Sequence, residues 1–320
     1  MNTAASSSSF GNITDYIESL NLDEATRCAL LHKLCGLREQ GLNIMITGAT
    51  GSGKSSTINA LFRADKARVG EGASPETQQI ARYDFDGMTI WDTPGLGDGD
   101  EADRRHTEAI ESKLRETGPD GKPLIDAVLV ILEAGSRDLG TSYKLINEIV
   151  MPLLDDHKRL VVAINQADMA LKGRHWDYDA NQPDATLLAA LDEMAAVVRK
   201  RIAASTGVDV EPVFYCAGYR ENGVQMPPYN LAKLLAAVLR RLPTGKRLLV
   251  AENMNRSREN YTSDDGRADY RGEVVSAFRE ACRDVGEAIG NSLFGKTGGA
   301  VGRMVGDVVG RIGDWISSWF

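Results

Sequence analysis

The sequence NIMITGATGSGKSST occupies residues Asn43–Thr57 and decides the expected fold. Its first five residues form a short apolar run typical of a buried β-strand, and a glycine-rich segment ending in lysine and serine follows at residues 48–55. Gly48, Gly51 and Gly53 permit backbone conformations that a Cβ would forbid, so successive N–H groups can converge on one anion. The stretch therefore predicts a phosphate-binding loop between a strand and a helix.

Each residue of this loop is a candidate ligand of a nucleoside triphosphate. The Lys54 ammonium would neutralise the β- and γ-phosphates, and the Ser55 hydroxyl would bind Mg²⁺. The helix expected to begin near Lys54 adds its positive N-terminal end beneath the phosphates. A plain glycine-rich turn is the alternative, which the strand before the loop and the helix after it disfavour. The predicted nucleotide-binding residues here are Gly48, Ala49, Thr50, Gly51, Ser52, Gly53, Lys54, Ser55 and Ser56.

Composition and charge limit the classes of protein to consider. The chain has 320 residues, of which 42% are apolar, enough for a sizeable core. Its formal charge of −8 gives no support for nucleic-acid binding through bulk charge. The four cysteines lie far apart without the close pairs of a metal site or disulfide framework, which indicates a reduced, cytoplasmic protein. No run of 18 or more residues is free of charge, so a conventional membrane span is not expected.

A second candidate site follows an expected β-hairpin. Residues 92–95, Asp-Thr-Pro-Gly, place the Asp92 carboxylate at a strand end, where it can hold Mg²⁺ through a water, and the Gly95 N–H can meet the γ-phosphate. Thr77 precedes the returning strand and is the predicted second metal contact, with Ser74 as the competing candidate. The expected catalytic residues are Lys54, Thr77 and Gly95. The expected metal ligands are Ser55, Thr77 and Asp92.

A third motif, Asn165-Gln166-Ala167-Asp168, follows a buried strand expected at residues 160–164. The Asp168 carboxylate can accept hydrogen bonds from both the N1–H and the 2-amino group of guanine, which adenine cannot reciprocate. The Asn165 side chain can bond the base and tie this loop to the phosphate loop. An ordinary Asn/Asp turn is the alternative. The position of residues 165–168 after the other two motifs favours recognition of guanine over an ordinary turn.

The three motifs, at residues 48–55, 92–95 and 165–168, together resemble those of Era-like GTPases. The whole pattern looks most like the bacterial and prophage-associated YfjP/YeeP-type GTPases. This resemblance implies an α/β fold, the three-layer α/β/α P-loop fold with a six-stranded, mostly parallel sheet. It implies GTP or GDP with Mg²⁺ as ligands, and a loop after the last strand whose backbone meets the guanine. Ala217 matches the small central residue of that loop.

Two residues depart from the pattern of such enzymes. Gln166 stands where the base motif usually has a lysine, so the charged end over the base is lost and nucleotide affinity is expected to be lower. Leu96 follows Gly95, where Ras-like enzymes carry a glutamine that orients the attacking water. Hydrolysis is therefore expected to be slow without a partner or self-association.

The sequence pattern divides the chain into four segments. These are a disordered tail (1–11), an N-terminal helical preface (12–40), a GTPase domain (41–243) and a helical C-terminal extension (244–320). The extension ends in an amphipathic helix expected at residues 297–320, where glycines recur every fourth residue beside an apolar stripe that includes Trp315 and Trp319. Packing of this helix within the protein or onto a partner is favoured over an interfacial membrane helix.

Two functions fit these patterns. The first is a GTP-hydrolysing switch, in which bound GTP orders residues 64–77 and 94–103, and hydrolysis relaxes them and changes the surface offered to an unidentified protein effector. The second is a GTP-controlled self-assembling or membrane-associated scaffold with negligible hydrolysis. In this second function GTP would only control self-association through the C-terminal helices. For either function the expected partners include a second copy, bound through the GTPase domain or the C-terminal helices. Use of ATP is disfavoured by Asp168.

Overall fold

A computed structural model describes residues 12–62, 68–69, 80–97, 99–136, 139–221, 224–294 and 299–320. A seven-stranded sheet with the order β2-β3-β4-β1-β5-β6-β9 forms its middle layer. β4, β1, β5, β6 and β9 run parallel, while β2 and β3 are antiparallel to their neighbours. The strands are β1 (Leu42–Gly48), β2 (Arg68–Val69), β3 (Ala81–Phe85), β4 (Met88–Asp92), β5 (Ala127–Glu133), β6 (Leu160–Asn165) and β9 (Val213–Phe214).

The predicted three-layer α/β/α fold with a mostly parallel sheet is confirmed. Six strands were expected, and the seventh is β2, whose two residues are too few to give a sequence pattern. β5 and β6 are near-continuous apolar runs because helices cover both of their faces. Alternate residues of β1 enter opposite cores, since Ile44 and Ile46 join one apolar cluster and Met45 the other.

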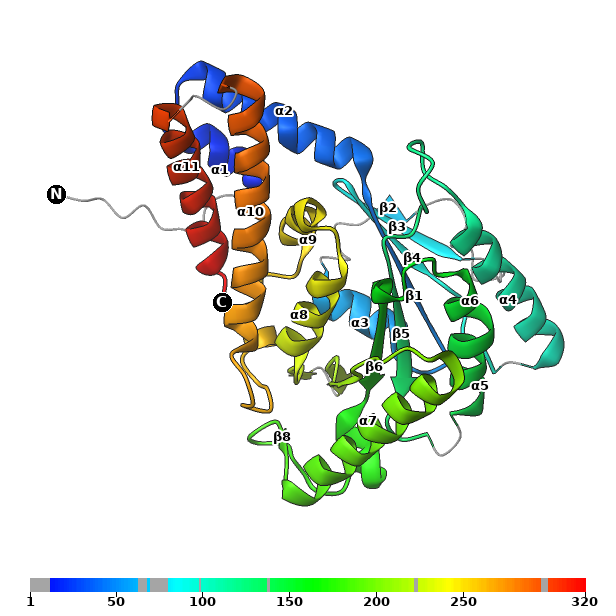
Figure 1. The fold of residues 1–320 in the computed structure, drawn as a ribbon. Helices are drawn as coiled ribbons and strands as arrows, with labels where there is room; N and C mark the ends of the chain where they lie inside the picture. The colour runs from blue at the N-terminus through cyan, green and yellow to red at the C-terminus, as the bar shows by residue number, and fades with distance from the viewer. Residues whose placement is uncertain are drawn as a thin grey trace.

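Helices flank the sheet on both sides, as Figure 1 shows. One face carries α3 (Lys54–Leu61) and α8 (Leu231–Arg241). The other carries α4 (Asp100–Arg115), α7 (Ala185–Thr206) and a helical run made of α5 (Gly140–Lys144), a π-helical stretch (Leu145–Val150) and α6 (Met151–Leu153). Two small hairpins, β7–β8 (Trp176–Asp177 and Gln182–Pro183) and β10–β11 (Tyr219–Glu221 and Val224–Met226), and 3₁₀ turns at His157–Arg159, Ala167–Gly173, Thr244–Lys246 and Arg258–Tyr261 complete the description.

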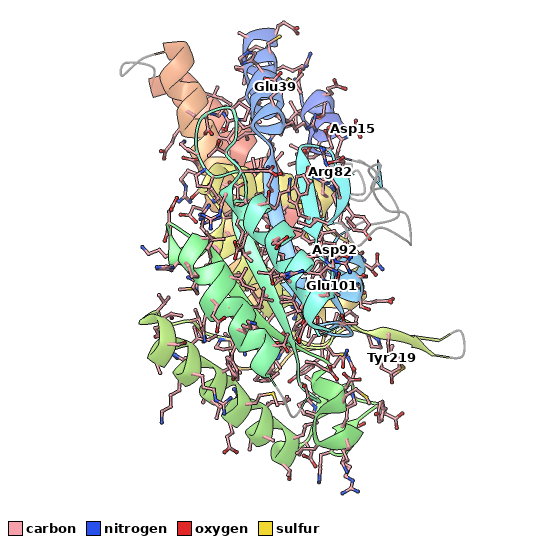
Figure 2. The ribbon with its side chains drawn as sticks, turned by 90° about the vertical axis from the view of Figure 1, so that its right-hand side faces the viewer. Asp15, Glu39, Arg82, Asp92, Glu101 and Tyr219 are labelled. Atoms are coloured by element: carbon pink, nitrogen blue, oxygen red, sulfur yellow. The ribbon has the colours of Figure 1, made fainter. Side chains whose placement is uncertain are left out.

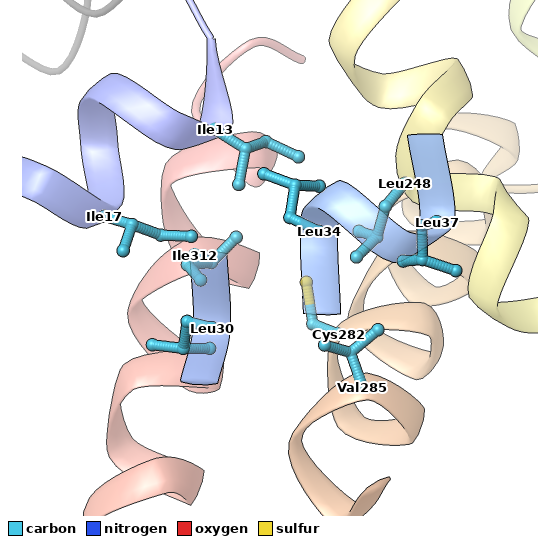
Figure 3. A pocket seen from close by; sticks show the side chains of 9 residues that line it. All are labelled: Ile13, Ile17, Leu30, Leu34, Leu37, Leu248, Cys282, Val285 and Ile312. Carbon is cyan, nitrogen blue, oxygen red and sulfur yellow. The ribbon is translucent and has the colours of Figure 1, made fainter. Parts of the chain in front are cut away.

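The first and last of the described helices pack together on the α8 side of the sheet (Figure 1). This helical module consists of α1 (Ile13–Ser19), α2 (Glu24–Gln40), α9 (Arg247–Asn253), α10 (Tyr270–Phe294) and α11 (Gly299–Ser317). The expected preface is two helices, because the Asp23 side chain caps α2 by accepting from the Thr26 N–H at 2.9 Å. Apolar side chains from all five helices surround a cavity of about 20 Å³ (Figure 3). The module therefore has an apolar interior of its own, continuous with the core on that face of the sheet.

The last helix, α11, turns its apolar stripe into the protein. Ile312 and Trp315 are buried, and the Trp315 ring stacks on Tyr16 of α1 with centroids 4.8 Å apart. Gly306 and Gly310 are exposed, and a Cβ at either would meet no atom within 4 Å. The apolar stripe, and not these glycines, makes the contact with the rest of the chain. Within the described ranges no helix combines the length and apolar character needed to cross a membrane.

Candidate nucleotide-binding site

The glycine-rich loop between β1 and α3 depends on residues without side chains. Gly51 and Gly53 have φ angles of 82° and 86°, which favour glycine. A Cβ at Gly53 would lie 2.2 Å from Asn165 Nδ2, and one at Gly48 would lie 2.2 Å from the Ile131 carbonyl oxygen. The loop is thus wedged against the ends of β5 and β6, and α3 begins immediately after it at Lys54. This is the strand, loop and helix arrangement that binds phosphates through backbone N–H groups.

Lys54 lies folded over this loop. Its Nζ donates to the carbonyl oxygens of Gly48 at 3.3 Å and Ala49 at 3.1 Å. The Ser52 hydroxyl is buried within the same loop and has no partner in the structure. The cradle therefore combines one ammonium group and one orphaned hydroxyl with the positive end of α3, which suits a polyphosphate.

The predicted metal ligands Ser55 and Asp92 meet beside the loop. β4 lies parallel to β1, so its last residue, Asp92, comes level with Ile46, and the Ser55 hydroxyl lies 3.5 Å from Asp92 Oδ2. Asp92 Oδ1 is buried without a partner. Burial raises the pKa of Asp92 to about 6, against the opposing effect of Lys54. A hydroxyl beside a carboxylate oxygen that has no hydrogen-bond partner is a set of ligands that fits Mg²⁺.

The other residues predicted to act on the γ-phosphate divide into two groups. Thr77 and its competitor Ser74 lie outside the described residues. Gly95 lies directly against the phosphate loop, where a Cβ would come within 2.5 Å of the Thr50 nitrogen. The Thr50 N–H donates to the Leu96 carbonyl at 3.0 Å, so the segment after Asp92 is joined to the loop through backbone.

His106 is a residue of this site that the sequence analysis missed. It is buried on α4, and its Nδ1 donates to the Gly95 carbonyl at 2.8 Å, which holds the Gly95–Leu96 peptide in place. The Leu96 side chain is buried in the apolar cluster beneath α4. His106 shares its face of α4 with Ile110 and Leu114, and a polar residue in that apolar pattern was the available signal.

Asn165 and Asp168 lie at the end of β6, behind the loop. Asn165 Nδ2 donates to the Ser52 carbonyl at 2.9 Å, and Asn165 Oδ1 accepts from the Ala217 N–H at 3.0 Å. One side chain thus ties the phosphate loop to the loop after β9. Asp168 is 3% exposed, and its Oδ1 has no partner. A buried carboxylate oxygen without a donor is costly unless a ligand supplies one.

Two further contacts hold the phosphate loop. Gln166 Nε2 donates to the Gly51 carbonyl at 2.8 Å, so the residue that replaces the usual lysine still bonds the loop. Thr57 donates to the Gly53 carbonyl at 2.8 Å, and the buried Tyr215 hydroxyl lies 2.6 Å from the Thr57 oxygen. Tyr215 must donate in this pair, because the Thr57 proton is already used. The sequence analysis missed both roles, although Tyr215 was visible as a hydroxyl in a buried strand.

Part of this chain is similar in sequence to known proteins. Residues 43–166 match the family described as 50S ribosome-binding GTPase. The Escherichia coli proteins YfjP and YkfA are 31% and 30% identical to this chain over 131 and 134 residues, which in each case is 40% of this chain and 42% of the relative. The chain thus spans less than half the length of these relatives. A crystal structure of Toc33 from Arabidopsis thaliana with GDP and Mg²⁺ aligns with a TM-score of 0.42 and 17% identity, covering 67% of this chain and 90% of Toc33.

The three motifs lie at the carboxyl ends of parallel strands, and the family match covers the first two motifs and ends at residue 166, within the third. Residues 43–166 therefore belong to a GTPase domain, and the chain is similar to YfjP and YkfA over 131 and 134 residues.

Proposed function

We propose that this protein binds GTP with Mg²⁺ and hydrolyses it slowly, as a nucleotide-dependent conformational switch. One observation carries the proposal. The glycine cradle lies between two carboxylates, the half-buried Asp92 and the buried Asp168, each with a buried oxygen that has no partner. One carboxylate is beside a serine hydroxyl, as a metal would require, and the other is at the loop expected to read the base.

Each residue then has a defined task. Lys54 would exchange its two carbonyl partners for phosphate oxygens, and Asn165 and Gln166 would hold the loop against the base side. Asp168 would accept the N1–H and 2-amino protons of guanine. Ser55 and Asp92 would hold Mg²⁺, with Thr77 as the proposed further ligand; the bound ion supplies neutralisation of charge that develops on the phosphates.

Slow hydrolysis follows from the residue after Gly95. The Leu96 side chain is 4% exposed and packs in an apolar cluster, so it cannot orient a water. Its backbone is bonded to the phosphate loop, and His106 holds the peptide that precedes it. We therefore expect an intrinsic turnover in which Gly95 contributes its N–H, and acceleration by a second copy or a protein effector.

The hairpin β3–β4 connects the site to the helical module. Its last residue is Asp92, and its tip, Asp86–Gly87, lies against α2 and α9. Asn253 Nδ2 donates to the Asp86 carbonyl at 2.9 Å, and Arg38 Nε lies 3.1 Å from Asp86 Oδ2. A displacement of Asp92 on metal binding would therefore shift the hairpin against α2 and α9. In this way the bound nucleotide would change the surface that the helical module offers to a partner.

Calorimetry and a turnover assay test the proposal. Wild-type protein with Mg²⁺ is expected to bind GDP and GTP, to release phosphate slowly, and to lose both properties in Lys54→Ala. Turnover per molecule that rises with protein concentration would identify self-association as the accelerator. Absence of heat with guanine nucleotides would overturn the proposal. Binding without any phosphate release would favour the scaffold alternative.

A further inference from the structure

A polar cleft of about 390 Å³ adjoins the nucleotide site and is assigned no function by the motifs. Its walls come from α3, from the loop after β9, and from residues 254–261, here called the connector, which follow α9 and include the last 3₁₀ turn. The volume falls within the range of roughly 300–1,000 Å³ typical of small-molecule sites. Ser56, Asn59, Ala217, Asn255, Ser257 and Asn260 are among the lining residues.

The position of the cleft indicates which part of a nucleotide would reach it. Ser56 is the third residue of α3, directly after the predicted metal ligand Ser55. Ala217 is bonded to Asn165, at the end expected to hold the base. The sugar of a nucleotide lies between its phosphates and its base, so a cleft that runs from Ser56 to Ala217 faces the sugar.

The chemistry of the lining agrees. None of the described residues that line the cleft carries a charge, which argues against a further phosphate or a metal ion. The connector contributes two amides and a hydroxyl, from Asn255, Asn260 and Ser257, and such neutral donors and acceptors match sugar hydroxyls.

The connector is held firmly on the side away from the cleft. The Asn255 N–H donates to the Leu61 carbonyl of α3 at 2.8 Å, and the Tyr261 hydroxyl donates to the Asn255 carbonyl at 2.8 Å. The Arg256 guanidinium lies 3.9 Å from the centre of the Trp319 ring. The polar stretch after residue 255 is therefore a fixed wall of the cleft. A fixed wall loses little freedom when a ligand binds.

We propose that this cleft receives the ribose of the bound guanine nucleotide, with connector residues Ser257 and Asn260 hydrogen-bonding its hydroxyls. The inference rests on the proposed function and adds to it that the C-terminal extension contacts the ligand directly. Two connector residues contact the C-terminal aromatic residues: Arg256 lies over the Trp319 ring, and the Tyr261 ring packs against Phe320. The extension thus becomes part of the nucleotide site as well as a neighbour of it.

The test pairs a protein change with a ligand change. Titration calorimetry would measure the affinity of wild type and of the Ser257→Ala/Asn260→Ala double variant for GDP and for 2′,3′-dideoxyguanosine diphosphate. We expect wild type to bind GDP about 5- to 30-fold more tightly than the dideoxy ligand, and the variant to bind both with similar, weaker affinity. Glu259→Gln, in the same 3₁₀ turn but outside the cleft lining, is the matched control and should behave as wild type.

Two outcomes would overturn the inference: equal loss of affinity for both ligands in the variant, or no loss for either. Asn260 also donates to the Ala60 carbonyl at 3.4 Å, so its loss could disturb the fold. Ser257→Ala, at an exposed position, then decides alone, with the thermal midpoint as the check on folding. Failure of wild type to bind GDP at all is a different result, because it overturns the proposed function itself.

Discussion

The buried carboxylates of the nucleotide site differ from those of the helical module and its contacts with the sheet. Asp92 and Asp168 each bury an oxygen without a partner. Glu252 of α9 receives two hydrogen bonds from Arg38, and Asp265 lies 2.7 Å from Lys233 Nζ. A buried charge is tolerated when it is paired, so the unpaired ones mark where a ligand is needed and the paired ones mark structure.

The sharpest test of this difference is Asp168→Asn. The amide oxygen can still accept from N1–H, but the NH2 group would face the guanine 2-amino group, donor against donor. Guanine thus loses one hydrogen bond to the carboxylate, and the 2-oxo group of xanthine gains one from the amide NH2. At about 1.5–3 kcal/mol each, the preference for GDP over xanthosine diphosphate should fall by about 10²–10⁴-fold. Competition binding with both diphosphates measures the change.

Asp265→Asn is the matched control for that experiment. Asp265 is equally buried but paired with Lys233, so its replacement should lower the free energy of unfolding without altering the choice of nucleotide. If both variants lost stability and neither changed the nucleotide preference, the two sets of carboxylates would have the same role.

Removing Arg38 should expose the cost of an unpaired charge in the module. Burial raises the pKa of Glu252, and Arg38 opposes that rise. A raised carboxyl pKa stabilises the fold below the ordinary value near 4.5, and this contribution is lost as the pH rises through the folded-state pKa. Without Arg38 the charged form of Glu252 is buried without a partner, so more stability is lost as the pH rises. Arg38→Ala should therefore lower the free energy of unfolding by about 3–5 kcal/mol at pH 8 and by clearly less at pH 5.

Urea unfolding at both pH values measures this effect. Arg199→Ala removes an exposed ion pair with Asp209 and should cost under about 1 kcal/mol at either pH. A penalty for Arg38→Ala that does not depend on pH would mean that lost packing, and not the Glu252 charge, explains the destabilisation.

The contrast between the two regions also explains what the sequence could predict. The phosphate loop, Asp92 and Asp168 follow apolar strands at short, fixed spacings, so local pattern was sufficient to place them at one sheet edge. The edge strand β2 and the break between α1 and α2 were not predicted, because each depends on a few residues and on their neighbours in space.

Long-range contacts were beyond the sequence pattern. The ion pair between Arg38 and Glu252 joins positions 214 residues apart, and Tyr215 reaches Thr57 across 158 residues. The polar sequence of the connector gives no sign that it is held in place, because its partners, the end of α3 and the C-terminal tryptophans, lie elsewhere in the chain. Polarity alone does not distinguish a mobile segment from one that is held by hydrogen bonds.

A smaller effect is expected from Tyr215→Phe. The change removes the donor to Thr57, whose own hydroxyl still bonds the Gly53 carbonyl, so the loop is loosened but kept. One neutral hydrogen bond is worth about 1 kcal/mol, which predicts about fivefold weaker GDP binding by calorimetry. Tyr270→Phe removes a hydroxyl that donates to Asp265 in the module. Tyr270→Phe should lower the free energy of unfolding without weakening GDP binding. If Tyr270→Phe and Tyr215→Phe weakened GDP binding equally, Tyr215 would have no special role at the phosphate loop.

The smallest effect is expected at Gln166. Asn165 and Gln166 both donate to the phosphate loop, and the Gln166 amide is the more exposed of the two. Gln166→Ala should weaken GDP binding about two- to fivefold, because solvent can replace the lost bond to the Gly51 carbonyl. Gln166→Lys should bind at least as tightly as wild type, since an ammonium can donate to the same carbonyl and adds charge near the nucleotide. Wild-type affinity in the alanine variant would show that Asn165 alone secures the loop. Weaker binding by the lysine variant would show that this site is built around a neutral amide, and that the glutamine is more than a tolerated replacement.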